Sequence, residues 1–114
     1  MLHQMKLNDH PFSQIEQGIK TVELRLYDEK RRAIRVGDEI EFVHRTDSRR
    51  RLRRRVLRLH VFATFEELYA VLSLLQCGYT EQTLPTASPR DMEQYYSREE
   101  EQAWGVVGIE LTDA

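Results

Sequence analysis

Four segments of this sequence carry the apolar pattern of β-strands, and helical signals separate them. Thr21 to Tyr27 alternates between apolar and polar residues with period two, which is typical of a strand with one buried face. Residues 39–44, 52–62 and 104–111 also favour strands, and the glycines of the last segment favour a bulge or close packing. Strands and helices interspersed along one short chain predict an α+β fold.

Helix start and stop signals divide the remainder of the chain. Ser or Thr followed three residues later by Glu is a capping-box pattern, Pro favours the first turn, and Gly favours a helix end. Residues 28–35 and 81–87 lack such patterns and are predicted to be loops. The helices are expected to begin at Asn8 or Asp9, Thr64, Ser88 and Ser97, the first two ending at Gly18 and Gly78.

The length of 114 residues predicts a single domain, residues 1–114. Hydrophobic residues make up 40% and charged residues 32%, which indicates a modest core beneath a highly charged surface. The sequence has no apolar run that could span a bilayer and no apolar stretch typical of a signal peptide, so we expect a cytoplasmic protein without membrane contact.

The metal-binding residue types show no ligand spacing. Cys77 is the sole cysteine, so it cannot form an internal disulfide and is expected to be a buried structural thiol. The four histidines are scattered along the chain. The sequence therefore predicts no metal site and no cofactor.

Three charged residues lie close together where the first helix leads into the first long strand. Lys20 follows the helix end, and Glu23 and Arg25, two apart on a strand, project from the same face. An ammonium, a carboxylate and a guanidinium in one place can hold a phosphate or a polar base edge. The alternative is a half-exposed strand with an ordinary surface ion pair, which contributes little.

The segment Gly18-x-Lys20-x-x-Glu23-x-Arg25 resembles the G-x-K-x-x-E-x-R signature of ASCH domains, which are PUA-like proteins linked to RNA. The resemblance extends over nearly the whole chain, because the turn at 36–38, the helix after Thr64 and the closing strand fall in the family's order. It implies a PUA-like fold: a small mixed β-barrel with flanking helices and a cleft floored by the signature residues.

The family includes RNA-binding proteins, members linked to ribonuclease activity, and small bacterial amidohydrolases that act on acetylated cytidine. In those amidohydrolases, the lysine that matches Lys20 works with a threonine three residues later. This chain has Glu23 at that position, which removes the hydroxyl nucleophile of the Thr–Lys pair.

A second cationic feature is the arginine run between residues 49 and 55. On one limb of a hairpin it would present guanidinium groups on both faces, with Arg53, Arg54 and Arg55 as candidate phosphate contacts. Two alternatives stay open: a solvated edge strand, or a patch that pairs with the acidic C-terminal region of the same or another chain.

Aromatic residues could stack on bases, and Tyr27 and Tyr95 are the candidate ligand contacts from a pool that also contains Tyr79, Tyr96 and Trp104. Tyr95 and Tyr96 are adjacent on a helical segment and therefore cannot both point inward. Trp104 is expected to open the last strand and to pack in the barrel.

These features predict an RNA- or nucleotide-binding module with a charged cleft around Lys20, Glu23 and Arg25. The alternative is a small hydrolase acting on a modified nucleoside (an amidohydrolase) or on RNA (a ribonuclease), with Lys20 and Glu23 as candidate catalytic residues. A third hypothesis is self-association through the oppositely charged regions. The expected partner is RNA, a nucleotide or a nucleoside.

Overall fold

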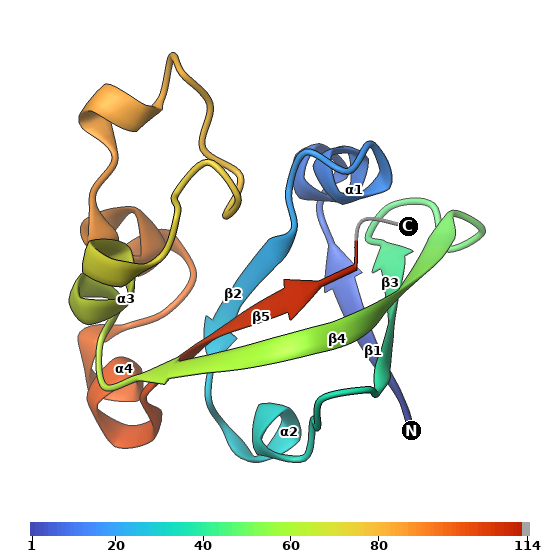
Figure 1. The fold of residues 1–114 in the computed structure, drawn as a ribbon, viewed down its shortest axis with the longest axis horizontal. Helices are drawn as coiled ribbons and strands as arrows, with labels where there is room; N and C mark the ends of the chain where they lie inside the picture. Colours follow the sequence, from blue (N-terminus) through green and yellow to red (C-terminus); the bar gives the residue numbers. More distant parts are fainter. Residues whose placement is uncertain (113–114) are drawn as a thin grey trace.

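The computed structural model describes residues 1–112 of the protein. Strands and helices are interspersed along the chain, as the patterns predict (Figure 1). The elements are β1 (Leu2–Leu7), α1 (Asp9–Glu16), β2 (Val22–Leu26), α2 (Glu29–Arg32), β3 (Glu39–His44), β4 (Arg51–Phe62), α3 (Phe65–Val71), the 3-10 helices η1 (Leu84–Thr86) and η2 (Pro89–Gln94), α4 (Arg98–Trp104) and β5 (Val106–Leu111).

The five strands form one curled sheet in the order β1-β3-β4-β5-β2. The pair β1–β3 is parallel, and the other neighbours are antiparallel. The long strand β4 turns the sheet, because its first half pairs with β3 and its second half with β5, with a register shift between Val56 and Arg58. The result is a half-barrel with flanking helices, which confirms the predicted α+β class and the small mixed barrel.

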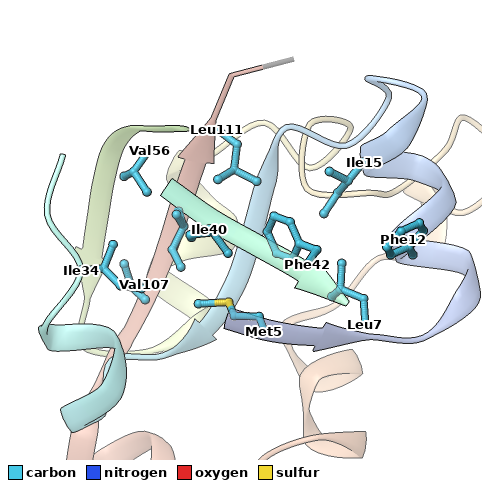
Figure 2. Close-up of a cluster of buried hydrophobic side chains, with 11 residues drawn as sticks. Met5, Leu7, Phe12, Ile15, Ile34, Ile40, Phe42, Val56, Val107 and Leu111 are labelled. Carbon is cyan, nitrogen blue, oxygen red and sulfur yellow. The ribbon is translucent and has the colours of Figure 1, made fainter. Parts of the chain in front are cut away.

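Two apolar clusters stabilise this sheet. One fills the curl and extends from Val107 of β5 past Met5 and Phe42 to Phe12 of α1 (Figure 2). The other packs the outer face of β2 and β5 against α3, with Leu24 and Leu68 among its buried members. Alternate residues of β2 belong to the second cluster. The residues between them therefore point to the opposite face of the strand, toward β1.

The structure corrects two of the predicted boundaries. The helix expected to reach Gly78 ends at Val71, because the chain returns to the sheet and the carbonyl of Gln76 accepts hydrogen bonds from the entry to β2. The expected loop at 28–35 contains the short helix α2, which Asp28 caps by accepting from the backbone N–H of Arg31 (3.1 Å).

The end of the chain also differs from the prediction. Trp104 does not open the last strand: it ends α4 and is 37% exposed, and Gly105, with φ of 73°, separates it from β5. The predicted caps at Ser88 and Ser97 are both confirmed as capping boxes, although Ser88 begins a 3-10 rather than an α-helix. No helix within residues 1–112 is long and apolar enough to cross a membrane.

Candidate functional site

Lys20 lies in the short connection between α1 and β2. Its backbone N–H donates to the carbonyl oxygen of Gln14 in α1 (3.1 Å). The next two backbone N–H groups, of Thr21 and Val22, donate to the carbonyl oxygen of Gln76 (2.9 and 3.0 Å). The backbone at Lys20 is therefore fixed on one side by α1 and on the other by the segment that follows α3.

The three signature side chains form one cluster. Nζ of Lys20 lies 2.7 Å from Oε1 of Glu23, and Nη2 and Nε of Arg25 lie 2.9 and 3.0 Å from its Oε2. Nη2 of Arg25 also donates to the carbonyl oxygen of Lys6 in β1 (3.1 Å). Arg25 thus connects β2 with β1, which are the two outer strands of the curled sheet.

The side chains of this cluster are largely buried, and the carboxylate of Glu23 is ionised. The side chain of Glu23 is 5% exposed, and those of Lys20 and Arg25 are 11% and 14% exposed. Burial alone would raise the pKa of Glu23, but the two neighbouring cations outweigh it and hold the pKa at about 2. The half-exposed strand with an ordinary surface ion pair is therefore not what this sequence forms.

The cluster lies at a cleft of about 600 Å³. One wall is the start of α1 with the ends of β1 and β3, and the other wall comes from residues 77–96. Figure 1 shows α1 and this second segment on either side of β2. Among the described residues that line the cleft, four side chains are cationic and two are acidic: Lys6, Lys20, Arg25 and Arg45, with Glu23 and Asp91.

A chain of hydroxyl hydrogen bonds runs along the second wall. The hydroxyl groups of Tyr69 and Tyr79 lie 2.7 Å apart, and that of Tyr79 donates to Oδ2 of Asp91 (2.7 Å). Burial raises the pKa of Tyr69, and burial together with both partners raises that of Tyr79 far above the usual range. The sequence analysis named Tyr79 only among the aromatic residues that could stack on bases, and it did not identify Tyr69 or Asp91 as site residues.

The structure places the two candidate tyrosines differently. Tyr95 and Tyr96 both line the cleft, but Tyr95 is 58% exposed while Tyr96 stacks on Phe65, so the expectation that only one of the pair points inward is confirmed. Tyr27 lies away from the cleft: its ring packs against the core inside the curl and carries the guanidinium of Arg32 at 4.4 Å from its centroid.

The candidate arginines of β4 also lie outside the cleft. Nε of Arg53 is 3.5 Å from Oε2 of Glu41 on the outer face of the sheet. Nη2 of Arg54 donates to the carbonyl oxygen of Ile15 near the end of α1 (3.2 Å). Arg55 is exposed, and its side chain forms no ion pair or hydrogen bond within residues 1–112.

Two cleft residues that the sequence analysis missed are Lys6 and Arg45. Both are exposed, and neither side chain forms an ion pair or hydrogen bond within the described part of the chain. The backbone N–H of Arg45 donates to the carbonyl oxygen of Leu7 (2.8 Å), which brings the ends of β1 and β3 together. Lys6 and Arg45 become neighbours through the parallel pairing of β1 with β3. No local sequence pattern predicts that pairing.

The cleft offers little to a metal ion. No group of three His, Cys, Asp or Glu residues within 1–112 is arranged to hold one. Cys77, which lines the cleft, is buried as expected, and burial raises the pKa of its thiol to about 11, so the thiolate is scarce at neutral pH. The chemistry that the site offers is hydrogen bonding and charge.

Comparisons with known proteins relate the chain to one protein family and to solved structures. The ASCH domain family matches residues 5–114. The crystal structure of a hypothetical protein, PH0355, has 30% sequence identity and a TM-score of 0.78 over 97% of both chains. The solution NMR structure of protein PF0455 from Pyrococcus furiosus has 29% identity and a TM-score of 0.69, covering 97% of this chain and 96% of that one.

A more distant structure has the same fold. The crystal structure of a mutant ZmASCH protein from Zymomonas mobilis has 14% identity and a TM-score of 0.67, over 96% of this chain and 68% of that one. This likeness confirms the predicted PUA-like fold. No curated protein matches the chain.

Proposed function

The chain belongs to the ASCH domain family, a PUA-like fold family generally associated with RNA binding, and we propose that it binds RNA or a nucleotide in the cleft around Lys20, Glu23 and Arg25. The proposal treats residues 1–114 as one binding module. The ligand contacts would come from the signature cluster at the base of the cleft and from Tyr95 on its wall.

The observation that carries the proposal is the fixed pair of cations beside Glu23. An ammonium has three donors and a guanidinium five, which together exceed what one carboxylate can accept. Glu23 therefore holds Lys20 and Arg25 in place while donors remain for an acceptor of the ligand. Because both side chains are already ordered, binding costs less side-chain entropy than it would with free cations.

The charge of the cleft supports an anionic or acceptor-rich ligand. Cationic side chains outnumber acidic ones in its lining, although the whole chain has a net charge of −2. A concave site with a positive excess attracts phosphate even when the net charge of the protein is negative. Nucleotides combine phosphate with acceptor groups on the base, and both fit this lining.

The hydrolase hypothesis receives less support from the electrostatics. A general base works best when its pKa lies near the working pH. The cations beside Glu23 hold its pKa at about 2, so its carboxylate is a weak base at neutral pH. We therefore favour binding, and cleavage of the ligand becomes an outcome of the test.

The test is a fluorescence-anisotropy titration with short single-stranded RNA. We expect saturable binding by the wild type, weakened about tenfold or more in Lys20→Ala and Arg25→Ala, with the recovered RNA intact. Arg25→Lys keeps the charge without the planar fork and is expected to recover part of the affinity. Melting curves for each variant separate lost binding from lost folding.

Arg55→Ala is the matched control, because it removes an exposed guanidinium outside the cleft. Its affinity should stay within twofold of the wild type. Equal weakening by Arg55→Ala and Arg25→Ala would contradict a binding site in the cleft, and no binding by the folded wild type would contradict the proposed function. RNA cleavage that disappears in Lys20→Ala would favour the hydrolase.

A further inference from the structure

We infer that the cleft holds a single-stranded segment in one orientation, with a phosphate against Lys6 and Arg45 and a base against Tyr95. This inference rests on the proposed function and adds the direction in which the ligand lies. It is carried by the separation of two kinds of side chain onto the two walls of the cleft.

Lys6 and Arg45 are the free cations of this site. The cations at the base of the cleft, Lys20 and Arg25, already share Glu23, whereas neither Lys6 nor Arg45 has a side-chain partner within residues 1–112. Both are exposed and both line the cleft on the side of β1 and β3. Two unpaired cations at the mouth of a cleft are suited to the phosphate of a backbone, which carries a full negative charge.

Backbone hydrogen bonds fix the positions of Lys6 and Arg45 in the fold. The carbonyl oxygen of Lys6 accepts from Arg25 (3.1 Å), and the backbone N–H of Arg45 donates to Leu7 (2.8 Å). The free charges are therefore attached to the same framework as the signature cluster. A ligand acceptor bound by Arg25 would keep an adjoining phosphate within the field of both cations.

Tyr95 is the matching feature of the opposite wall. Its ring is 58% exposed, while the neighbouring Tyr96 is stacked on Phe65 with 6.1 Å between the ring centroids. The centroids of Tyr95 and Tyr96 lie 6.4 Å apart with the rings tilted by 57°, so the ring of Tyr96 supports Tyr95, and both residues line the cleft. An exposed, supported aromatic ring is a platform for base stacking, which tolerates any base.

The size of the cleft favours one nucleotide over a duplex. A volume of about 600 Å³ lies within the range of small-ligand sites. A paired base has both faces covered by stacking, whereas an unpaired base can be splayed onto an aromatic ring. The ligand that fits both walls is therefore a single strand, with its backbone on the β1 side and one base turned toward Tyr95.

The test compares three sets of variants in anisotropy titrations at two salt concentrations. The ligands are a six-nucleotide single-stranded RNA and a blunt duplex of the same sequence. Lys6→Ala/Arg45→Ala is expected to weaken single-strand binding about tenfold or more and to lower the salt slope by about 1.4, since two phosphate contacts of about 0.7 each are lost. Arg49→Ala/Arg55→Ala removes the same charge away from the cleft and should change neither quantity.

Tyr95→Ala should weaken binding by about fivefold or more with an unchanged salt slope, and Tyr95→Phe should restore it. The duplex should bind at least tenfold more weakly than the single strand. Equal effects of the two double variants, or full affinity in Tyr95→Ala, would overturn the inference. If the inference fails in this way but Lys20→Ala and Arg25→Ala still abolish RNA binding, the proposed function stands without the inferred orientation of the ligand. A folded wild type that binds neither the single strand nor the duplex overturns the inference and the proposed function.

Discussion

Two glutamates of this protein each lie between two cations, and the two sites differ in how far those cations are exposed. Glu23 is paired with Lys20 and Arg25, and its carboxylate and both cations are largely buried. The side chain of Glu41 is also only 11% exposed, but its partners Arg51 (3.1 Å) and Arg53 (3.5 Å) are 48% and 55% exposed. Water screens the second site and barely reaches the first, so the same arrangement of charges has different consequences for stability and binding.

The comparison also separates a fixed cationic site from a solvated one. Arg51 and Arg53 can exchange Glu41 for water at little cost, because they remain hydrated. Lys20 and Arg25 cannot, since losing Glu23 would leave two cations partly out of water without a counter-charge. Burial therefore fixes the donors of the cleft, whereas the guanidinium groups of Arg51 and Arg53 remain hydrated.

Replacing the two glutamates one at a time should give the largest difference in the free energy of unfolding. Glu23→Gln is expected to lower the free energy of unfolding by about 3 kcal/mol, because it leaves a buried charge uncompensated. Glu41→Gln should cause a clearly smaller loss. Urea unfolding followed by circular dichroism measures both, and equal losses would contradict the role of burial.

Acid unfolding should show the same difference through pH. The folded-state pKa of Glu23 is about 2, below its ordinary value of 4.5, so its stabilising contribution is complete above pH 4.5 and is lost as the pH falls toward 2. Wild-type stability should therefore fall more steeply between pH 5 and pH 2 than that of Glu23→Gln. Asp38, whose pKa is also about 2, contributes to the fall in both proteins, so the difference between the two curves reports Glu23. Parallel curves would show that Glu23 is not held ionised.

The local part of this site could be predicted from the sequence. Period two places Glu23 and Arg25 on one face of β2, and the glycine before Lys20 marks the preceding helix end. Their burial could not be predicted, because it depends on α1 and on the segment around Gln76, which come from both sides of the strand in sequence. Strand periodicity identifies the residues that lie on the same face of a strand. It does not identify the elements that cover that face.

The remainder of the cleft depends on contacts between distant parts of the chain. Tyr69 and Asp91 meet through Tyr79, and Lys6 and Arg45 become neighbours through the parallel pairing of β1 with β3. The arginine run shows the opposite relation, because it is conspicuous in the sequence but lies outside the cleft in the structure, and its contact with phosphate stays a prediction. Charge density along a sequence does not distinguish paired guanidinium groups from free ones.

Two glycines test whether the buried cluster depends on the position of the Lys20 stem. Gly78 and Gly37 both have positive φ, 109° and 94°. A Cβ at Gly78 would lie 3.2 Å from Cδ of Lys20 and 3.0 Å from Oε1 of Gln14, whereas one at Gly37 would meet nothing within 4 Å. Both Gly→Ala changes should therefore cost about 1 kcal/mol from backbone strain, and Gly78→Ala about 1 kcal/mol more.

Only the Gly78 change should affect the site. We expect Gly78→Ala to weaken RNA binding several-fold by displacing Lys20, while Gly37→Ala leaves the affinity within twofold at the same temperature. Anisotropy titration together with urea unfolding measures the two effects separately. Equal affinities in the two variants would show that the cleft tolerates movement of Lys20.

The smallest expected effect concerns two adjacent arginines of β4. Nη2 of Arg54 donates to the carbonyl oxygen of Ile15, which lies near the end of α1, while the side chain of Arg55 is exposed on the other face of the strand. Arg54→Ala should lower the free energy of unfolding by about 1 kcal/mol, because the carbonyl of Ile15 loses its side-chain donor and keeps only the backbone N–H of Gly18. Arg55→Ala should stay within about 0.5 kcal/mol of the wild type. Both should keep their RNA affinity if the arginine run serves the fold, and a lower salt slope in Arg54→Ala would instead place the bound strand along β4.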